Sequence, residues 1–138
     1  MESEPSRILL VEDDPTLARI YTRALRASGF LVDHAPDGVE GLDRLLRGDY
    51  DVVVSDVCMP RMGGLELLEA ARRTRPDVPV VLMTAQLDAD TYSRARALGS
   101  VRYLLKPVGL EQLANAVQTA ALLRASRIRT HERRRALR

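Results

Sequence analysis

Short apolar runs alternate with amphipathic segments five times along the chain. The runs at residues 7–11, 31–35, 51–55, 78–83 and 101–105 are five or six residues long, as strands are. The segments between them repeat apolar residues at spacings of three and four, which is typical of helices. The helices are expected between Asp14 and Gly29, at 38–46, at 65–73, at about 89–98, and from about 110 to 123 or beyond. Strict alternation with short connections predicts an α/β fold with a parallel sheet.

The number of units decides which kind of parallel sheet is expected. A closed barrel needs eight β/α units, and five favour an open, doubly wound sheet with helices on both faces. Runs such as LLV and VPVVLM are apolar at every position, as strands covered on both faces must be. Periodicity does not distinguish the two common strand orders, and we choose 2-1-3-4-5 for five strands.

Length and charge divide the chain into two parts. The 138 residues suit one domain, which we expect to span residues 1–123. Residues 124–138 hold seven arginines and one glutamate, whereas the first 123 residues hold 14 basic and 18 acidic side chains. We therefore expect an acidic globule followed by a basic C-terminal extension.

Composition also favours a cytoplasmic protein. No apolar run is long enough to cross a membrane, and the first residues, MESEPSR, lack the pattern of a secretory signal. Cys58 is the single cysteine, so no internal disulfide can form. We expect no membrane partner.

Polar residues follow four of the five expected strands. They are Glu12-Asp13-Asp14, Ser55-Asp56, Thr84-Ala85 and Lys106-Pro107. Ligands of open α/β sheets bind outside the carboxyl ends of the strands, so these residues are expected to share one small volume.

The combination of residue types indicates metal-assisted phosphoryl chemistry. Clustered carboxylates repel one another unless a cation joins them, and Mg²⁺ bridges carboxylates to phosphate oxygens. Lys106 supplies a charge and Thr84 a hydrogen bond for a phosphoryl oxygen, and Asp56 can act as the nucleophile. Each residue alone has an ordinary explanation, and Asp14 is expected to be a helix cap. The coincidence at four strand ends favours a site.

These residues also match a known family. The segments ILLVEDDP, DVVVSDVCMPRMGGLELL, VVLMTA and ALGSVRYLLKP resemble the receiver domain of two-component response regulators. The resemblance covers about residues 7–123, and order, spacing and residue types agree together.

The resemblance assigns a role to each acidic residue. It implies that Asp56 accepts a phosphoryl group in a reaction that depends on Mg²⁺ or Mn²⁺. Asp13 would bind the metal directly and Glu12 through water. The main-chain carbonyl of Cys58 would complete the ligands from the protein.

The resemblance also implies a switch. Thr84 and Lys106 would bind oxygens of the phosphoryl group on Asp56, and the Lys106-Pro107 peptide would be cis. Tyr103 would turn inward as Thr84 moves toward the phosphate, although a plain half-buried strand residue is the alternative.

The partners follow from the same resemblance. The phosphoryl donor would be a phosphohistidine on a sensor histidine kinase or a phosphotransfer protein. The switched surface, residues 88–123, would contact an output domain, an effector or a second copy of the chain. Such a receiver is a signalling phosphoacceptor rather than an enzyme.

Two other classes share part of this pattern. Hydrolases of the haloacid-dehalogenase type also use a strand-end aspartate, but they place it on the first strand and need a second aspartate where this chain has Cys58. A flavin-binding module of similar fold needs a phosphate loop rich in Gly, Ser and Thr after the first strand, where this chain has EDDP.

The basic extension leaves two interpretations open. In the first, the last helix continues past Leu123 toward Ile128 as a solvated linker to an output domain. In the second, a stand-alone receiver uses Arg133-Arg134-Arg135 to bind nucleic acid or another acidic partner. We favour the linker, because most charge runs are solvated surfaces.

Overall fold

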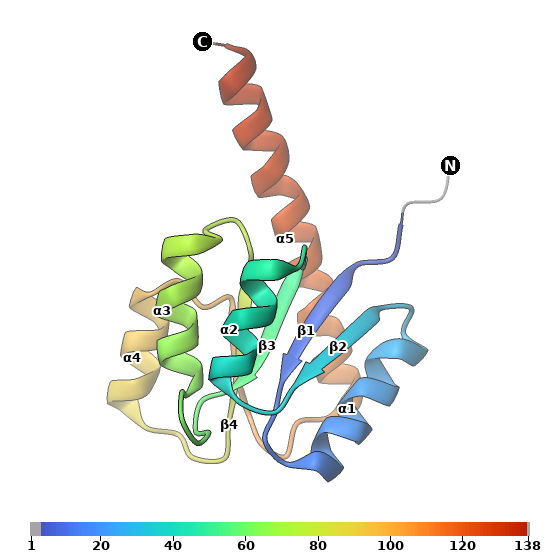
Figure 1. The fold of residues 1–138 in the computed structure, drawn as a ribbon, viewed down its shortest axis with the longest axis vertical. Helices are drawn as coiled ribbons and strands as arrows, with labels where there is room; N and C mark the ends of the chain where they lie inside the picture. Colours follow the sequence, from blue (N-terminus) through green and yellow to red (C-terminus); the bar gives the residue numbers. More distant parts are fainter. Residues whose placement is uncertain (1–3, 138) are drawn as a thin grey trace.

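A five-stranded parallel sheet forms the centre of the computed structural model, which describes residues 4–137 (Figure 1). The strand order is β2-β1-β3-β4-β5, which confirms the predicted α/β fold and its order. The elements along the chain are β1 (Arg7–Val11), α1 (Pro15–Ala27), β2 (Leu31–Ala35), α2 (Gly38–Arg47), β3 (Val52–Asp56), α3 (Gly64–Thr74), β4 (Val80–Thr84), α4 (Ala89–Ala97), β5 (Arg102–Leu105) and α5 (Leu110–Ala136).

Helices cover both faces of the sheet. Helices α1 and α5 pack on one face, where Tyr21 and Val117 meet strand residues such as Leu10. Helices α2, α3 and α4 pack on the other face, where Leu67 meets Leu9. Neighbouring residues of one strand therefore enter different cores, which is why the central strands β1, β3 and β4 are apolar through most of their length.

Strand register brings the polar strand ends to one edge of the sheet. Asp56 lies beside Met83, and Thr84 lies beside Leu105. The residue after each strand thus emerges at the same edge, as the sequence pattern predicted. Asp14 caps α1 as expected, since its Oδ1 accepts the main-chain N–H groups of the first turn.

A few boundaries differ from the predicted ones by one or two residues. β3 begins at Val52 rather than Asp51, whose carboxylate instead accepts the first N–H of β1 at 2.8 Å. β4 begins at Val80 rather than Val78, because the N–H of Val78 closes a turn with the carbonyl of Arg75.

Helix α5 continues beyond the sheet at the end where the strands begin (Figure 1). Arg124 fixes the helix to the body at this point. Its Nη1 lies 2.6 Å from Oδ1 of Asp51, and its Nη2 lies 3.3 Å from a carboxylate oxygen of both Asp49 and Asp77. The Arg124 side chain is only 15% exposed, so the first residue of the expected extension contacts the domain. The division of the chain after residue 123 stays a prediction, and Arg138 lies outside the described residues.

None of the helices among residues 4–137 combines the length and the apolar character that crossing a membrane requires.

Candidate functional site

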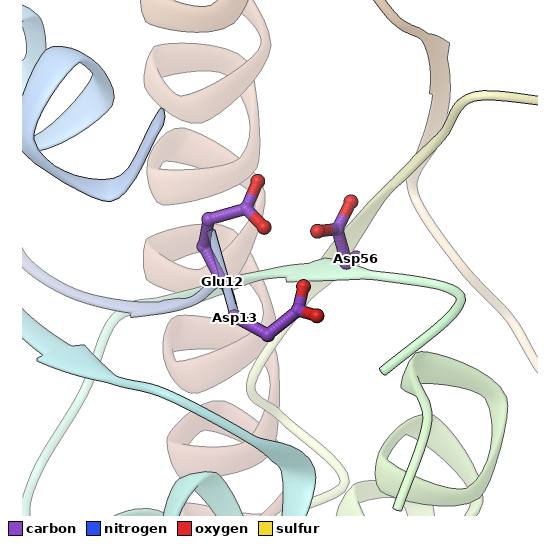
Figure 2. Close-up of side chains that lie close together, drawn as sticks. All are labelled: Glu12, Asp13 and Asp56. Atoms are coloured by element: carbon purple, nitrogen blue, oxygen red, sulfur yellow. The ribbon is translucent and has the colours of Figure 1, made fainter. Parts of the chain in front are cut away.

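Three carboxyl groups converge at the carboxyl edge of the sheet. Ligand atoms of Glu12, Asp13 and Asp56 all lie within 4.8 Å of one another. Figure 2 shows the three side chains pointing toward one another from the ends of β1 and β3. Glu12 is fully buried and Asp56 nearly so, whereas Asp13 is exposed. The sequence predicted this cluster.

Lys106 joins the two buried members of the cluster. Its Nζ lies 2.7 Å from Oε1 of Glu12 and 2.7 Å from Oδ1 of Asp56. The lysine comes from the loop after β5 and is 15% exposed. Its contact with Glu12 was not predicted, because the sequence indicated only that Lys106 contacts a phosphoryl oxygen.

The pKa values of the two buried carboxyl groups shift in opposite directions. Burial, and the nearby Glu12 carboxylate, raise the pKa of Asp56 to about 8. Burial also opposes ionisation of Glu12, but hydrogen bonds with Asp56 and Lys106 outweigh it and hold the pKa of Glu12 below its usual value. Protonation is therefore more favourable at Asp56 than at Glu12. Burial disfavours the ammonium of Lys106 too, but its two acidic partners raise its pKa above the usual value.

The cluster opens into a cavity of about 410 Å³. Asp13 and Asp56 line it together with Thr84, Lys106 and Cys58, which were also predicted for the site. Further lining residues are Glu12, Asp14, Leu17, Ala85 and Gln86.

The cluster has the properties of a cation site. Three carboxyl groups face a single lysine, so full ionisation leaves a net negative charge. Oxygen ligands of this kind suit a hard divalent cation. An acidic triad able to hold Mg²⁺ is thus present.

Thr84 lines this cavity, and Tyr103 lies near Thr84 on the side of α4. The Thr84 hydroxyl donates to the carbonyl of Gln86 at 2.9 Å and accepts the Gln86 N–H at 3.2 Å. The Tyr103 ring meets Tyr92 of α4 edge to face, with 5.3 Å between centroids. The Tyr103 hydroxyl is buried and has no hydrogen-bond partner among the described residues. The Lys106-Pro107 peptide is cis.

Three residues near the site were not singled out from the sequence. Nε2 of His34 lies 2.7 Å from the carbonyl oxygen of Glu12, although the end of β2 gave no sign of a role. Asp37 and Arg61 form an ion pair at 3.2 Å, between the segment after β2 and the loop after β3. Residues so far apart in sequence leave no local pattern that predicts such pairs.

The comparisons with known proteins identify the family. The family model of the response regulator receiver domain matches residues 8–118 of the sequence. The chain belongs to the response regulator receiver family. A receiver domain is a signalling phosphoacceptor rather than an enzyme. Membership of this family sets aside both the hydrolase and the flavin-binding alternatives.

Curated relatives of this receiver domain are two-component response regulators. It is 39% identical over 120 residues to response regulator MprA of Mycobacterium sp. (strain KMS), covering 87% of this chain and 51% of that protein. It is 38% identical over 118 residues to transcriptional regulatory protein QseB of Haemophilus influenzae, covering 86% of this chain and 52% of that protein. The chain thus spans about half the length of these relatives.

Solved receiver structures have the same fold. A CheY-like receiver domain from Methanospirillum hungatei superposes with a TM-score of 0.85 at 25% identity, covering 89% of this chain and 98% of the other. The response regulator TrrA from Thermotoga maritima, in complex with Mg(2+)-BeF, gives a TM-score of 0.76 at 29% identity, covering 83% and 98%.

Proposed function

We propose that Asp56 accepts a phosphoryl group from the phosphohistidine of a sensor histidine kinase or a phosphotransfer protein. The supporting observation is that Asp56 ends a central strand at the cavity, within reach of both an acidic pair and a lysine. A carboxylate oxygen of Asp56 attacks phosphorus and forms the new P–O bond. The P–N bond breaks, and its electron pair returns to the imidazole nitrogen.

A divalent cation, Mg²⁺ or Mn²⁺, would be held by Asp13 and Asp56, by Glu12 through water, and by the main-chain carbonyl of Cys58. The cation would neutralise charge on the phosphoryl oxygens. The raised pKa of Asp56 gives a reason why the reaction would depend on a cation. A nearby positive charge favours the ionised carboxylate, which is the form that attacks phosphorus. The relative TrrA was solved in complex with Mg(2+)-BeF, which supports a divalent cation as a ligand of this chain too.

Lys106 and Thr84 would bind the phosphoryl group after transfer. Lys106 already contacts Asp56 at 2.7 Å, so its ammonium lies where new anionic oxygens appear. The Thr84 hydroxyl is bound to Gln86, and moving it to a phosphoryl oxygen would exchange these hydrogen bonds for a charge-assisted one.

The charge added at Asp56 would then change the α4-β5-α5 surface, residues 88–123. Tyr103 is the link we propose, since its ring lies between the Thr84 side of the cavity and Tyr92 on α4. An output domain or effector would read this surface, with pairing of two copies as the alternative.

Residues 124–138 would link the receiver to an output segment. The continuous helix α5 and the contacts of Arg124 support a linker that begins from a fixed position on the domain. The mycobacterial and Haemophilus relatives, which are about twice as long as the matched region, are consistent with this arrangement.

Phosphorylation by a small donor tests the proposal directly. Purified protein is incubated with acetyl phosphate and Mg²⁺, and its intact mass is measured. We expect the wild type to gain one phosphoryl group, and both the Asp56→Asn variant and wild type with chelator to gain none. An equal gain in Asp56→Asn would overturn the assignment of Asp56.

A further inference from the structure

The loop between β3 and α3, residues 57–63, is held against the start of α2. The Gly38 N–H donates to the carbonyl oxygen of Met62 at 3.1 Å. A Cβ atom at Gly38 would lie only 2.3 Å from the same oxygen, so the two main chains are in direct contact. This loop includes Cys58, which lines the acidic cavity.

An ion pair makes a second contact between this loop and the start of α2. Nη1 of Arg61 lies 3.2 Å from Oδ2 of Asp37, whose side chain is 10% exposed. The other oxygen of Asp37, Oδ1, caps α2 by accepting the Glu40 N–H at 2.9 Å. One nearly buried carboxylate thus binds the first turn of α2 with one oxygen and the β3-α3 loop with the other.

The backbone of Arg61 lies in the left-handed region. Its φ is +70°, the only positive value at a non-glycine residue among residues 4–137. A non-glycine residue in this region costs on the order of 1 kcal/mol and persists where its surroundings hold it. The ion pair with Asp37 is the contact that the Arg61 side chain makes in this conformation.

The pair joins the segments that follow the two strands on either side of β1. Asp37 follows β2 and Arg61 follows β3, and β1, which leads into Glu12 and Asp13, lies between these two strands. The end of β2 is also bound to the acidic pair, because the Glu12 N–H donates to the Ala35 carbonyl at 3.1 Å. The ion pair therefore connects the segment beside the acidic pair to the loop that carries Cys58.

We propose that the Asp37-Arg61 pair is a latch that sets the affinity of the acidic site for a divalent cation. It holds the Cys58 segment at a fixed position relative to Glu12 and Asp13. Both residues are positioning residues, because they act through the loop rather than on the cation. The inference rests on the proposed metal site and adds the element that regulates its affinity.

Calorimetric titration with Mg²⁺, in the absence of any phosphoryl donor, tests the latch. We expect Arg61→Ala and Asp37→Asn each to raise the Kd by about threefold to tenfold, the range of a partly exposed ion pair that supports metal ligands. Arg61→Lys keeps the cation and should restore most of the affinity. Arg61→Gly relieves the strained φ without restoring the cation, and should bind as weakly as Arg61→Ala. The matched control is Arg47→Ala, which removes an exposed ion pair on α2 (3.0 Å to Asp43) and should leave the Kd unchanged.

The outcomes separate the latch from the metal site. If the wild type binds Mg²⁺ and Asp13→Asn abolishes binding, the site stands. A Kd within twofold of wild type in both Arg61→Ala and Asp37→Asn would then overturn the latch alone, and so would wild-type affinity in Arg61→Gly. A lower melting temperature with an unchanged Kd would show a purely structural role and would also overturn it. Absence of Mg²⁺ binding in the wild type overturns the metal site and the latch together.

Discussion

Replacing Asp56 by asparagine should stabilise the metal-free protein. The substitution removes a carboxyl group whose ionisation in the fold is opposed by burial and by Glu12, which raise its pKa from 3.8 to about 8. Asparagine keeps an oxygen that can accept from Lys106.

The magnitude follows from the two pKa values. At about 1.4 kcal/mol per pH unit, the full shift corresponds to about 6 kcal/mol of folding free energy once Asp56 is ionised. Asp56 faces an open cavity and contacts Lys106, so screening reduces this figure, and we expect about 2–3 kcal/mol. Because the pKa is raised in the folded state, the contribution of Asp56 is most favourable below about pH 4 and is lost as the pH rises through about 8. The advantage of Asp56→Asn should therefore grow as the pH rises from 6 to 8.

Urea unfolding measures this difference. The chain has no tryptophan, so the transition is followed by circular dichroism in the presence of a chelator. Asp43→Asn, on the exposed side of α2, is the control for an Asp-to-Asn change outside the site. Saturating Mg²⁺ should stabilise the wild type more than Asp56→Asn and so reduce the difference in unfolding free energy between the two proteins. Two results would contradict this prediction. One is metal-free Asp56→Asn that is no more stable than wild type at pH 8, and the other is a difference in unfolding free energy that does not change with pH.

Three further substitutions test other parts of the structure. Arg124→Gln should lower the free energy of unfolding by about 1–2 kcal/mol, because it breaks a largely buried charge-assisted contact. The control Arg129→Gln, on the exposed part of α5, should change the free energy of unfolding by less than about 0.5 kcal/mol. Equal effects of the two substitutions would contradict the conclusion that Arg124 fixes α5 to the domain. Gly64→Ala should lower the melting temperature much more than Gly109→Ala, because a Cβ atom at Gly64 would lie 2.3 Å from the main-chain oxygen of Asp56, whereas the nearest atom to a Cβ at Gly109 lies 3.8 Å away. Similar melting temperatures would argue against the close packing of Gly64 on the end of β3. Lys106→Ala should weaken the spectral change that NMR detects in residues 88–123 after phosphorylation, and an unchanged response would remove Lys106 from the switch.

Much of the fold could be predicted because its signals are local. Strands buried on both faces are mostly apolar, so runs such as Val52–Val54 stand out from the amphipathic helices around them. The candidate site could be predicted for the same reason, since parallel strands bring the residues after β1, β3, β4 and β5 to one edge whatever the details of packing.

Contacts between distant side chains could not be predicted. Nothing near Arg124 in the sequence indicates that three aspartates from two loops surround it. The positive φ of Arg61 and its pairing with Asp37 depend on how the β3-α3 loop rests on α2. The contact between Lys106 and Glu12 likewise joins residues that are 94 positions apart.

The most direct test of the account locates the phosphoryl group. After reaction with acetyl phosphate and Mg²⁺, borohydride reduction converts an aspartyl phosphate to homoserine, which tandem mass spectrometry assigns to one residue. We predict homoserine at position 56, dependent on Mg²⁺ and absent when the donor is omitted. Homoserine at position 13 instead, or no homoserine at any aspartate, would contradict the central claim that Asp56 is the phosphoacceptor.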